Sequence, residues 1–259
     1  MSAAGRPATG PRRGAERVSG MDPAYVATHV EEDRRHWWFR GRLAVLLATL
    51  RRVLPPGRLR LLELGCGTGN VLAALAEFGM AVGMETHPDL AAAARAAGLD
   101  VRPGRLPGDL VVEPGWADAV LLLDVLEHLD DDVAALVTAR RALRPGGLLV
   151  ITVPAYRWLW SGHDVALGHR RRYTARELSR VVERAELAVV HASYFNTLLF
   201  PAVALTRAWK RLRRDASHDL RRPSPAINRW LEWMFALERH LVPRVTLPFG
   251  ASLLVVARR

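Results

Sequence analysis

The sequence predicts a doubly wound α/β fold built on parallel strands, and three observations lead to that prediction. Short apolar segments alternate with helical segments between residues 59 and 194, which is the pattern of βαβ units. The strand-like segments are apolar throughout, as expected for parallel strands covered on both faces. A glycine-rich turn over residues 65–69 follows the first of them, at the strand end where such folds bind ligands.

Periodicity and turn residues place the elements in order. Pro88 begins one expected helix, the acids 130–132 suit the start of another, and the pair Thr174 and Glu177 forms a capping box. Residues 144–147, Arg-Pro-Gly-Gly, are expected to end a helix. The expected strands are residues 59–64, 81–85, 99–102, 117–123, 148–153, 187–194 and 252–257, and the expected helices are 22–53, 69–78, 88–97, 130–143, 174–185, 196–214 and 227–241.

Composition and charge narrow the class of protein. The chain has 259 residues and a single cysteine, Cys66, which fits a reducing, cytoplasmic setting. Residues 1–20 lack the apolar stretch of a signal peptide and are expected to form a disordered tail, with one domain over residues 21–259. The net charge of +11 falls entirely on residues 170–259, where 18 basic residues meet 7 acidic ones. This asymmetry suggests an anionic partner for the C-terminal part.

The spacing of the glycines in Leu61–Asn70, LLELGCGTGN, separates three classes of ligand. A dinucleotide site requires G-x-G-x-x-G, but Asn70 takes the third glycine's place. A phosphate-binding P-loop requires a following lysine, and the chain's only lysine is Lys210. Glu63, inside the preceding strand, would repel a pyrophosphate and suit a cationic ligand.

A second acid, Glu85, adds to the description of the expected ligand. Glu85 ends the second expected strand, where a carboxylate can accept hydrogen bonds from two vicinal ribose hydroxyls. The alternative is an ordinary surface acid before a helix. Together with the glycine turn, Glu85 favours a nucleoside with a cationic group and no pyrophosphate, a description that S-adenosylmethionine (SAM) meets.

Four segments together resemble the class I SAM-dependent methyltransferases: LLELGCGTGN, VGMETHP, LLLDVLEHLDDD and LRPGGLLVITVP. The resemblance covers residues 36–194 and 250–258. It implies a Rossmann-like, seven-stranded mixed sheet whose closing strand is antiparallel, with SAM as cofactor. By the same resemblance Glu63 and the glycine turn lie against the amino-acid part of SAM, Glu85 holds the ribose, and Leu106 or the backbone near Arg105 replaces the usual adenine contact. The implied cofactor-binding residues are Glu63, Gly65, Cys66, Gly67, Gly69, Glu85, Thr86, Leu106 and Asp124.

Two further segments, EEDRRHWWFRGR (residues 31–42) and HDVALGHRRRYT (residues 163–174), resemble a bacterial subgroup with an N-terminal His-Trp-Trp-Phe helix, similar to methyltransferase types 11 and 12. The subgroup is often associated with cell-surface polysaccharide or lipid-linked sugar pathways. Trp37, Trp38 and Phe39 are consecutive, so one helix face cannot bury all three. Some of them are expected to line a lid or cleft, and the alternative is packing on the sheet.

Three interpretations of the catalytic residues stay open. In the first, Asp124 contacts the cofactor while Glu127 and His128 are turn residues. In the second, the D-x-x-E-H run resembles the E-x-x-E-H metal set of ubiquinone-pathway O-methyltransferases, with Asp124, Glu127, His128 and His163 (or His169) as ligands of Mg²⁺ or Mn²⁺. In the third interpretation His128 or His169 is a general base. One or two of the three arginines at 170–172 could then clamp an anionic group of the substrate.

Residues 195–249 are expected to form a basic helical insertion before the last strand. Its apolar and basic halves fit a cap over the substrate pocket, a peripheral contact with an anionic membrane, or a nucleic-acid surface, of which the last is the least favoured. The expected reaction is methyl transfer to an oxygen, or a nitrogen, of a small-molecule, sugar or lipid-linked acceptor. The alternatives are a nicotinamide-dependent oxidoreductase and a SAM-binding scaffold without catalysis. A cytoplasmic location follows, with a peripheral position at the inner membrane face as its variant.

Overall fold

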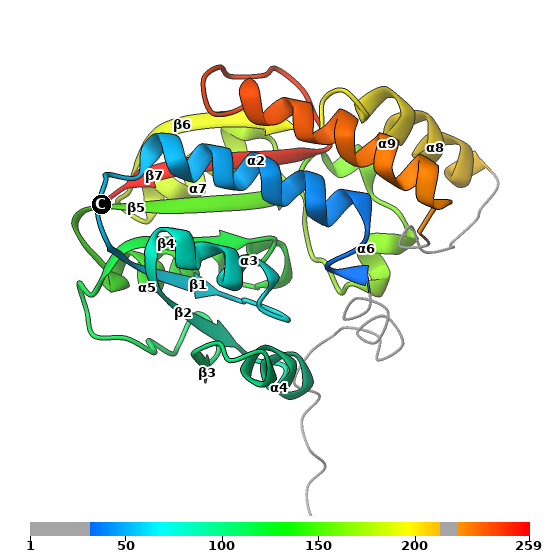
Figure 1. Ribbon diagram of the computed structural model, residues 1–259. Helices are drawn as coiled ribbons and strands as arrows, with labels where there is room; N and C mark the ends of the chain where they lie inside the picture. Colours follow the sequence, from blue (N-terminus) through cyan, green and yellow to red (C-terminus); the bar gives the residue numbers. More distant parts are fainter. Residues whose placement is uncertain (1–31, 213–221) are drawn as a thin grey trace, which may run out of the picture.

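The computed structural model describes residues 32–212 and 222–259 (Figure 1). The tail expected over residues 1–20 and the first part of the helix expected over residues 22–53 lie outside this part of the chain.

One seven-stranded sheet forms the centre of the molecule, in the order β3-β2-β1-β4-β5-β7-β6. The first five strands pair in parallel, and β7 lies antiparallel between β5 and β6. This confirms the mixed, Rossmann-like topology, including its antiparallel closing strand. The bounds are β1 Leu59–Leu64, β2 Gly79–Glu85, β3 Val101–Pro103, β4 Ala117–Leu123, β5 Leu143–Pro154, β6 Ala188–Phe195 and β7 Ser252–Arg258.

Helices cover both faces of the sheet (Figure 1). Side chains of α2, α3, α4 and α9 share one apolar core with one face of the strands, whereas α5 and α7 share a second core with the other face. The bounds are α2 Trp37–Val53, α3 Asn70–Ala74, α4 Pro88–Ala96, α5 Asp132–Ala142, α6 Gly162–Ala166, α7 Ala175–Arg184, α8 Phe200–Leu212 and α9 Pro225–Ala236, with single-turn 3₁₀ segments at Leu75–Glu77, Leu126–His128, Arg157–Leu159 and Leu237–His240.

Several expected boundaries were wrong for local reasons. The helix expected from residue 130 begins at Asp132, because the Asp131 side chain accepts a hydrogen bond from Ala134 N and caps it. The helix expected from residue 196 begins at Phe200, since Asn196 has a left-handed backbone with φ of 56°. Residues 144–147 do not separate a helix from a strand: β5 already begins at Leu143. The short helix α6 was not expected.

Helix α9 fastens α2 to the body of the protein. Asn228 accepts a hydrogen bond from Trp37 N and donates one to Arg35 O, at 3.0 Å each. Gly41 allows the helices to approach closely, because a Cβ at this position would stand 2.5 Å from the Phe235 ring. Contact between α2 and α9 therefore holds α2 against one face of the sheet. No helix in the described ranges has both the length and the apolar run that crossing a membrane requires.

Candidate functional site

A cavity of about 1190 Å³ opens at the carboxyl ends of the parallel strands. Its walls come from the loops after β1, β2 and β4, from the start of α2, from the α6 region and from α8. Pockets for one drug-sized ligand occupy about 300–1000 Å³. The cavity therefore has room for a nucleoside cofactor and a second molecule.

The glycine turn forms part of the cavity wall with its backbone. Gly65 and Gly67 line the cavity, and both have positive φ angles, 81° and 55°. The amides of Gly65 and Cys66 donate to Met84 O, which ties the turn to β2. A Cβ on Gly67 would meet no protein atom within 4 Å. The bare backbone at Gly67 thus leaves a cradle that a side chain would fill.

The other members of the turn have packing roles. Gly69 caps α3, and a Cβ there would stand 2.3 Å from Leu99. The Cys66 sulfur lies against Gly83, and burial is the main cause of its raised thiol pKa. Neither Cys66 nor Gly69 lines the cavity. The expectation that these two residues contact the cofactor directly therefore gains no support from the cavity lining.

Glu63 lies behind the turn and does not line the cavity. Burial raises the pKa of its carboxyl to about 8; Arg42 opposes the shift, and the charges of Asp33 and Glu85 add to it. One oxygen, Oε2, accepts no hydrogen bond. Glu63 is therefore a buried acid that a nearby cation would ionise.

Glu85 closes the cavity at the end of β2. Its Oε2 accepts from Gly67 N at 2.8 Å, and its Oε1 accepts from the amides of Thr86 and His87. Thr86 also lines the cavity and donates its hydroxyl to Gly104 O. The carboxylate expected to meet a ribose is thus fixed by three backbone amides beside the glycine turn. Leu106 and Arg105 line the same region, where the adenine contact was expected.

Asp124 connects the strand ends to the lid. It follows β4 with a left-handed backbone, φ 57°, and its carboxylate lies 2.8 Å from the Arg42 guanidinium. The Thr152 hydroxyl also donates to it, and Arg42 lies over the Trp38 ring, 5.1 Å from its centroid. Asp124 lines the cavity. A carboxylate expected at the cofactor therefore also anchors α2.

The α6 region carries a buried charge cluster around Asp164, which sequence reasoning did not single out. His169 Nδ1 lies 2.9 Å from Asp164 Oδ1. Arg172 donates to both Asp164 oxygens at 2.7 and 3.0 Å, and Ser161 N donates to Oδ2. Burial opposes ionisation of Asp164, but the hydrogen bonds from His169 and Arg172 hold its pKa well below the ordinary range. The Ser161-x-x-Asp164 capping box was the available signal.

Glu127 and His128 complete this wall. Glu127 is fully buried, neither carboxylate oxygen has a hydrogen-bond partner, and burial together with the charge of Asp124 raises its pKa well above the ordinary value. Burial and the neighbouring His169 lower the pKa of His128 to about 3. The two imidazoles meet edge to face, 4.8 Å apart, and His169 Nε2 lies 3.9 Å from Glu127 Oε1.

The expected metal-ligand set assembles only in part, with His169 as the histidine from the later loop. Among the described residues, Glu127, His128 and His169 bring ligand atoms within 4.8 Å of one another. Asp124 and His163 line the cavity but do not join this group, and Asp124 is paired with Arg42. One carboxylate and two imidazoles do not fit Mg²⁺ or Mn²⁺, both of which prefer oxygen ligands. No step of the reaction is therefore assigned to a metal.

The arginine run has structural partners. Arg170 contacts Asp130 and donates to His128 O, and Arg171 donates to Asp132 and to Asp130 O. Arg172 is committed to Asp164. The hypothesis that one or two of these arginines clamp an anionic substrate is not supported, because each already binds groups of the protein.

The aromatic run at the start of α2 lines the cavity, which was one of the two interpretations of its sequence. Trp37, Trp38 and Phe39 all line the cavity, and Trp37 also packs edge to face on Phe235. Opposite them, α8 contributes residues that the sequence did not indicate: Ala202, Val203, Thr206 and Arg207. The cavity wall is therefore largely aromatic toward the start of α2 and mixes apolar and polar side chains toward α8.

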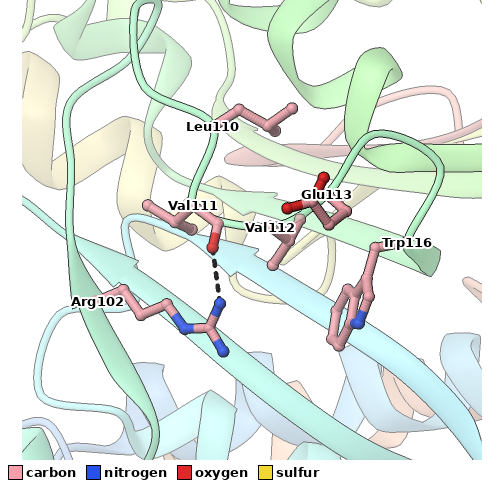
Figure 2. Close-up of a pocket in the computed structure, with 6 residues that line it drawn as sticks. All are labelled: Arg102, Leu110, Val111, Val112, Glu113 and Trp116. Carbon is pink, nitrogen blue, oxygen red and sulfur yellow. Dashed lines mark hydrogen bonds between the residues drawn. The ribbon is translucent and has the colours of Figure 1, made fainter.

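A second cavity, of about 230 Å³, lies beside β3 and before β4 (Figure 2). Arg102 donates there to Val111 O and also to Asp100. The remaining lining is Leu110, Val111, Val112, Glu113 and Trp116. This hollow is too small for a nucleoside and a second substrate, so the larger cavity is the candidate site.

Known proteins resemble the chain in sequence and in fold. A profile of the methyltransferase domain family matches residues 17–192. The probable S-adenosylmethionine-dependent methyltransferase of Mycolicibacterium smegmatis is 31% identical over 159 residues, 60% of each chain. A ubiquinone biosynthesis O-methyltransferase of Methylobacterium nodulans is 33% identical over 159 residues, 54% of this chain and 64% of its own. The chain thus spans less than two thirds of the length of either relative.

Solved structures share the fold. A SAM-dependent methyltransferase of Thermotoga maritima has a TM-score of 0.56 at 19% identity, covering 90% of this chain and 98% of that one. A SAM-dependent methyltransferase of Archaeoglobus fulgidus has a TM-score of 0.56 at 18% identity, covering 92% and 100%. At these identities the likeness is one of fold alone.

Proposed function

The chain belongs to the methyltransferase domain family; from that premise we propose that it is a SAM-dependent methyltransferase and that it methylates a hydroxyl oxygen of a small or lipid-linked acceptor, such as a sugar. The observation that carries this proposal is the His169–Asp164 pair, which lies at the same cavity as the glycine turn. The named O-methyltransferases among the relatives support oxygen over nitrogen as the acceptor atom.

The side of the cavity that is formed by the loops after β1, β2 and β4, which we call the cofactor wall, fits SAM. Gly67 offers a backbone cradle without a side chain, and Glu85 ends beside it, held by the Gly67 amide. Gly65 and Asp124 would complete the contact. Glu63, buried behind the turn, favours a cation nearby because a positive charge lowers its raised pKa. When bound, SAM supplies an electrophilic methyl carbon on a sulfonium.

His169 is the proposed general base. A carboxylate only accepts hydrogen bonds, so Asp164 requires the proton on Nδ1 and leaves the Nε2 lone pair available. The acceptor's hydroxyl proton passes to Nε2, and Asp164 stabilises the imidazolium that results. Arg172 balances the charge of Asp164 in the resting state. His128 is the weaker candidate, because its lowered pKa makes it a poor base.

The lid residues orient the acceptor and exclude water. Trp37, Trp38 and Phe39 cover one side of the cavity, and Ala202 and Val203 of α8 cover the other. Excluding water strengthens the electrostatic contacts inside the site. The apolar area of these walls suits an acceptor that is itself partly apolar.

The test measures S-adenosylhomocysteine release with a catechol, a hexose, a polyprenyl diphosphate-linked hexose and benzylamine as acceptors. We expect turnover with at least one hydroxyl acceptor and a loss of about 10²–10⁴-fold in kcat for His169→Asn, with SAM affinity retained. His240→Asn, at an exposed histidine outside the cavity, is the matched control.

Unchanged turnover in His169→Asn would exclude His169 as the base. Turnover with benzylamine alone would move the acceptor atom to nitrogen. SAM binding without turnover for any probe would favour the scaffold interpretation.

A further inference from the structure

Helix α8 exposes an apolar stripe on the side away from the cavity. Leu198, in the turn before α8, and Leu205 and Trp209 on the helix have exposed fractions of 43%, 72% and 57%. Pro201 is also exposed, and residues 201, 205 and 209 follow helical spacing. The neighbouring positions Ala202, Val203 and Thr206 line the cavity. One short helix thus forms the cavity wall and presents apolar side chains to its surroundings.

Helix α9 repeats this arrangement. Ile227, Trp230 and Trp233 are each more than half exposed, whereas Asn228 and Phe235 on the other side hold α2. Isolated exposed apolar residues are common on soluble proteins, but grouped tryptophans and aliphatic residues mark interaction surfaces. We call the six exposed residues of the two stripes the docking surface: Leu198, Leu205, Trp209, Ile227, Trp230 and Trp233.

Positive charge accompanies the docking surface. Arg229, Arg239 and Arg244 are exposed, and none of them is paired with an acid within residues 32–212 and 222–259. The acids of this segment are occupied: Glu232 pairs with Arg40, and Glu238 is buried and accepts from two backbone amides. The described part of this region therefore carries uncompensated cations on α9, at Arg229, and in the segment that follows it, at Arg239 and Arg244.

The docking surface lies on the helices that border the cavity. Leu231 of α9, Pro223 before it and four residues of α8 line the cavity. Tryptophans and aliphatic residues that enter the interface, with arginines on anionic headgroups, are the composition that binds a bilayer surface. An RNA-binding surface would stack bases on aromatic rings, and exposed aliphatic residues such as Leu205 and Ile227 would add little to such binding.

We propose that the docking surface binds the face of an anionic lipid bilayer and that the cavity receives its acceptor from that membrane. The second half of this proposal rests on the proposed function, whereas the first half does not. The apolar face enters the headgroup region, and Arg229, Arg239 and Arg244 bind anionic headgroups. An amphiphilic acceptor can then move from the bilayer between α8 and α9 toward His169.

The test is vesicle flotation of the full chain with phosphatidylcholine vesicles, with and without phosphatidylglycerol. We expect binding to the anionic vesicles only, weakened by salt, and at least tenfold weaker binding for Trp209→Ser/Trp230→Ser/Trp233→Ser and for Arg229→Gln/Arg239→Gln/Arg244→Gln. The matched control is Arg176→Gln/Arg180→Gln/Arg184→Gln, which removes the same charge from three exposed positions of α7. We expect it to bind within twofold of the wild type.

Circular dichroism and SAM titration on each variant establish that fold and cofactor site are intact. Equal binding to neutral and anionic vesicles, or an equal loss in the α7 control, would overturn the proposal, and so would a wild-type dimer that the tryptophan variant abolishes. If vesicles bind as expected but no lipid-linked acceptor turns over, docking stands and the proposed acceptor is wrong.

Discussion

The two walls of the cavity are built in different ways. The cofactor wall consists of loops that directly follow β1, β2 and β4, and its contacts join residues close in the chain or on adjacent strands, such as Gly67 and Glu85. The acceptor wall joins α2, the α6 region, α8 and α9, and depends on buried polar side chains such as Asp164 and Asn228. Buried acids occur in both walls, but Glu85 in the first is fixed by backbone amides, whereas Asp164 in the second is fixed by the side chains of His169 and Arg172. The acceptor wall should therefore respond more strongly to single side-chain changes.

The largest effect is expected at the Asp164 cluster. Asp164→Asn leaves the buried Arg172 without its anion, so we expect the free energy of unfolding to fall by about 3 kcal/mol at pH 7. The depressed pKa of Asp164 contributes stability above about pH 4, the ordinary range of an aspartate, and this contribution is lost as pH falls. Urea unfolding from pH 7 to pH 3 should show a steeper acid loss in the wild type than in the variant. Parallel pH curves would contradict a charged Asp164 cluster.

Next in size is Glu85→Ala in the cofactor wall. It removes the carboxylate that we place at the ribose, and we expect SAM affinity to fall by about 30-fold, or about 2 kcal/mol. Asp89→Ala is the control, because Asp89 lies only four residues further on and its side chain is 84% exposed. Calorimetric titration of both variants measures the difference. Equal losses would place the ribose elsewhere.

A smaller effect is expected from alanine at Gly67, and a matched glycine distinguishes the strain of a positive φ angle from loss of contact with the cofactor. Gly67→Ala and Gly146→Ala both place a Cβ at a positive φ in open space, but Gly67 alone faces the cavity. Each should cost about 1 kcal/mol of unfolding free energy. Only Gly67→Ala should also weaken SAM binding. Thermal unfolding and SAM titration of both variants would measure the two effects. Similar SAM affinities for the two variants would remove Gly67 from the cofactor site.

The smallest difference concerns the junction of α2 and α9. Asn228→Ala removes two part-buried hydrogen bonds and should cost about 1–2 kcal/mol. Arg40→Gln breaks the exposed Arg40–Glu232 pair between the same helices and should cost less than about 0.5 kcal/mol. Urea unfolding of both variants tests whether the buried amide is what fastens the lid. The reverse order would assign that role to the ion pair.

The sequence predicted the cofactor wall better than the acceptor wall, for a physical reason. The strands over residues 59–64 and 117–123, and the Glu85 strand end, follow from local apolar runs and turn residues. The pairs Asp124–Arg42 and Asn228–Trp37 depend on which distant segments meet in space, and single-sequence spacing does not encode that. Spacing likewise left open whether His163 or His169 joins Glu127 and His128; the structure brings His169 to them, whereas Asp124 and His163 stay outside the group.

The most direct test of the account is calorimetric titration of the full chain with SAM, S-adenosylhomocysteine and NADH, repeated on Glu85→Ala. The account predicts micromolar binding of SAM, about −8 kcal/mol, comparable binding of S-adenosylhomocysteine, no binding of NADH, and a large loss in the variant. If the chain bound NADH but not SAM, or if Glu85→Ala bound SAM as tightly as the wild type, a SAM site at the glycine turn would be contradicted.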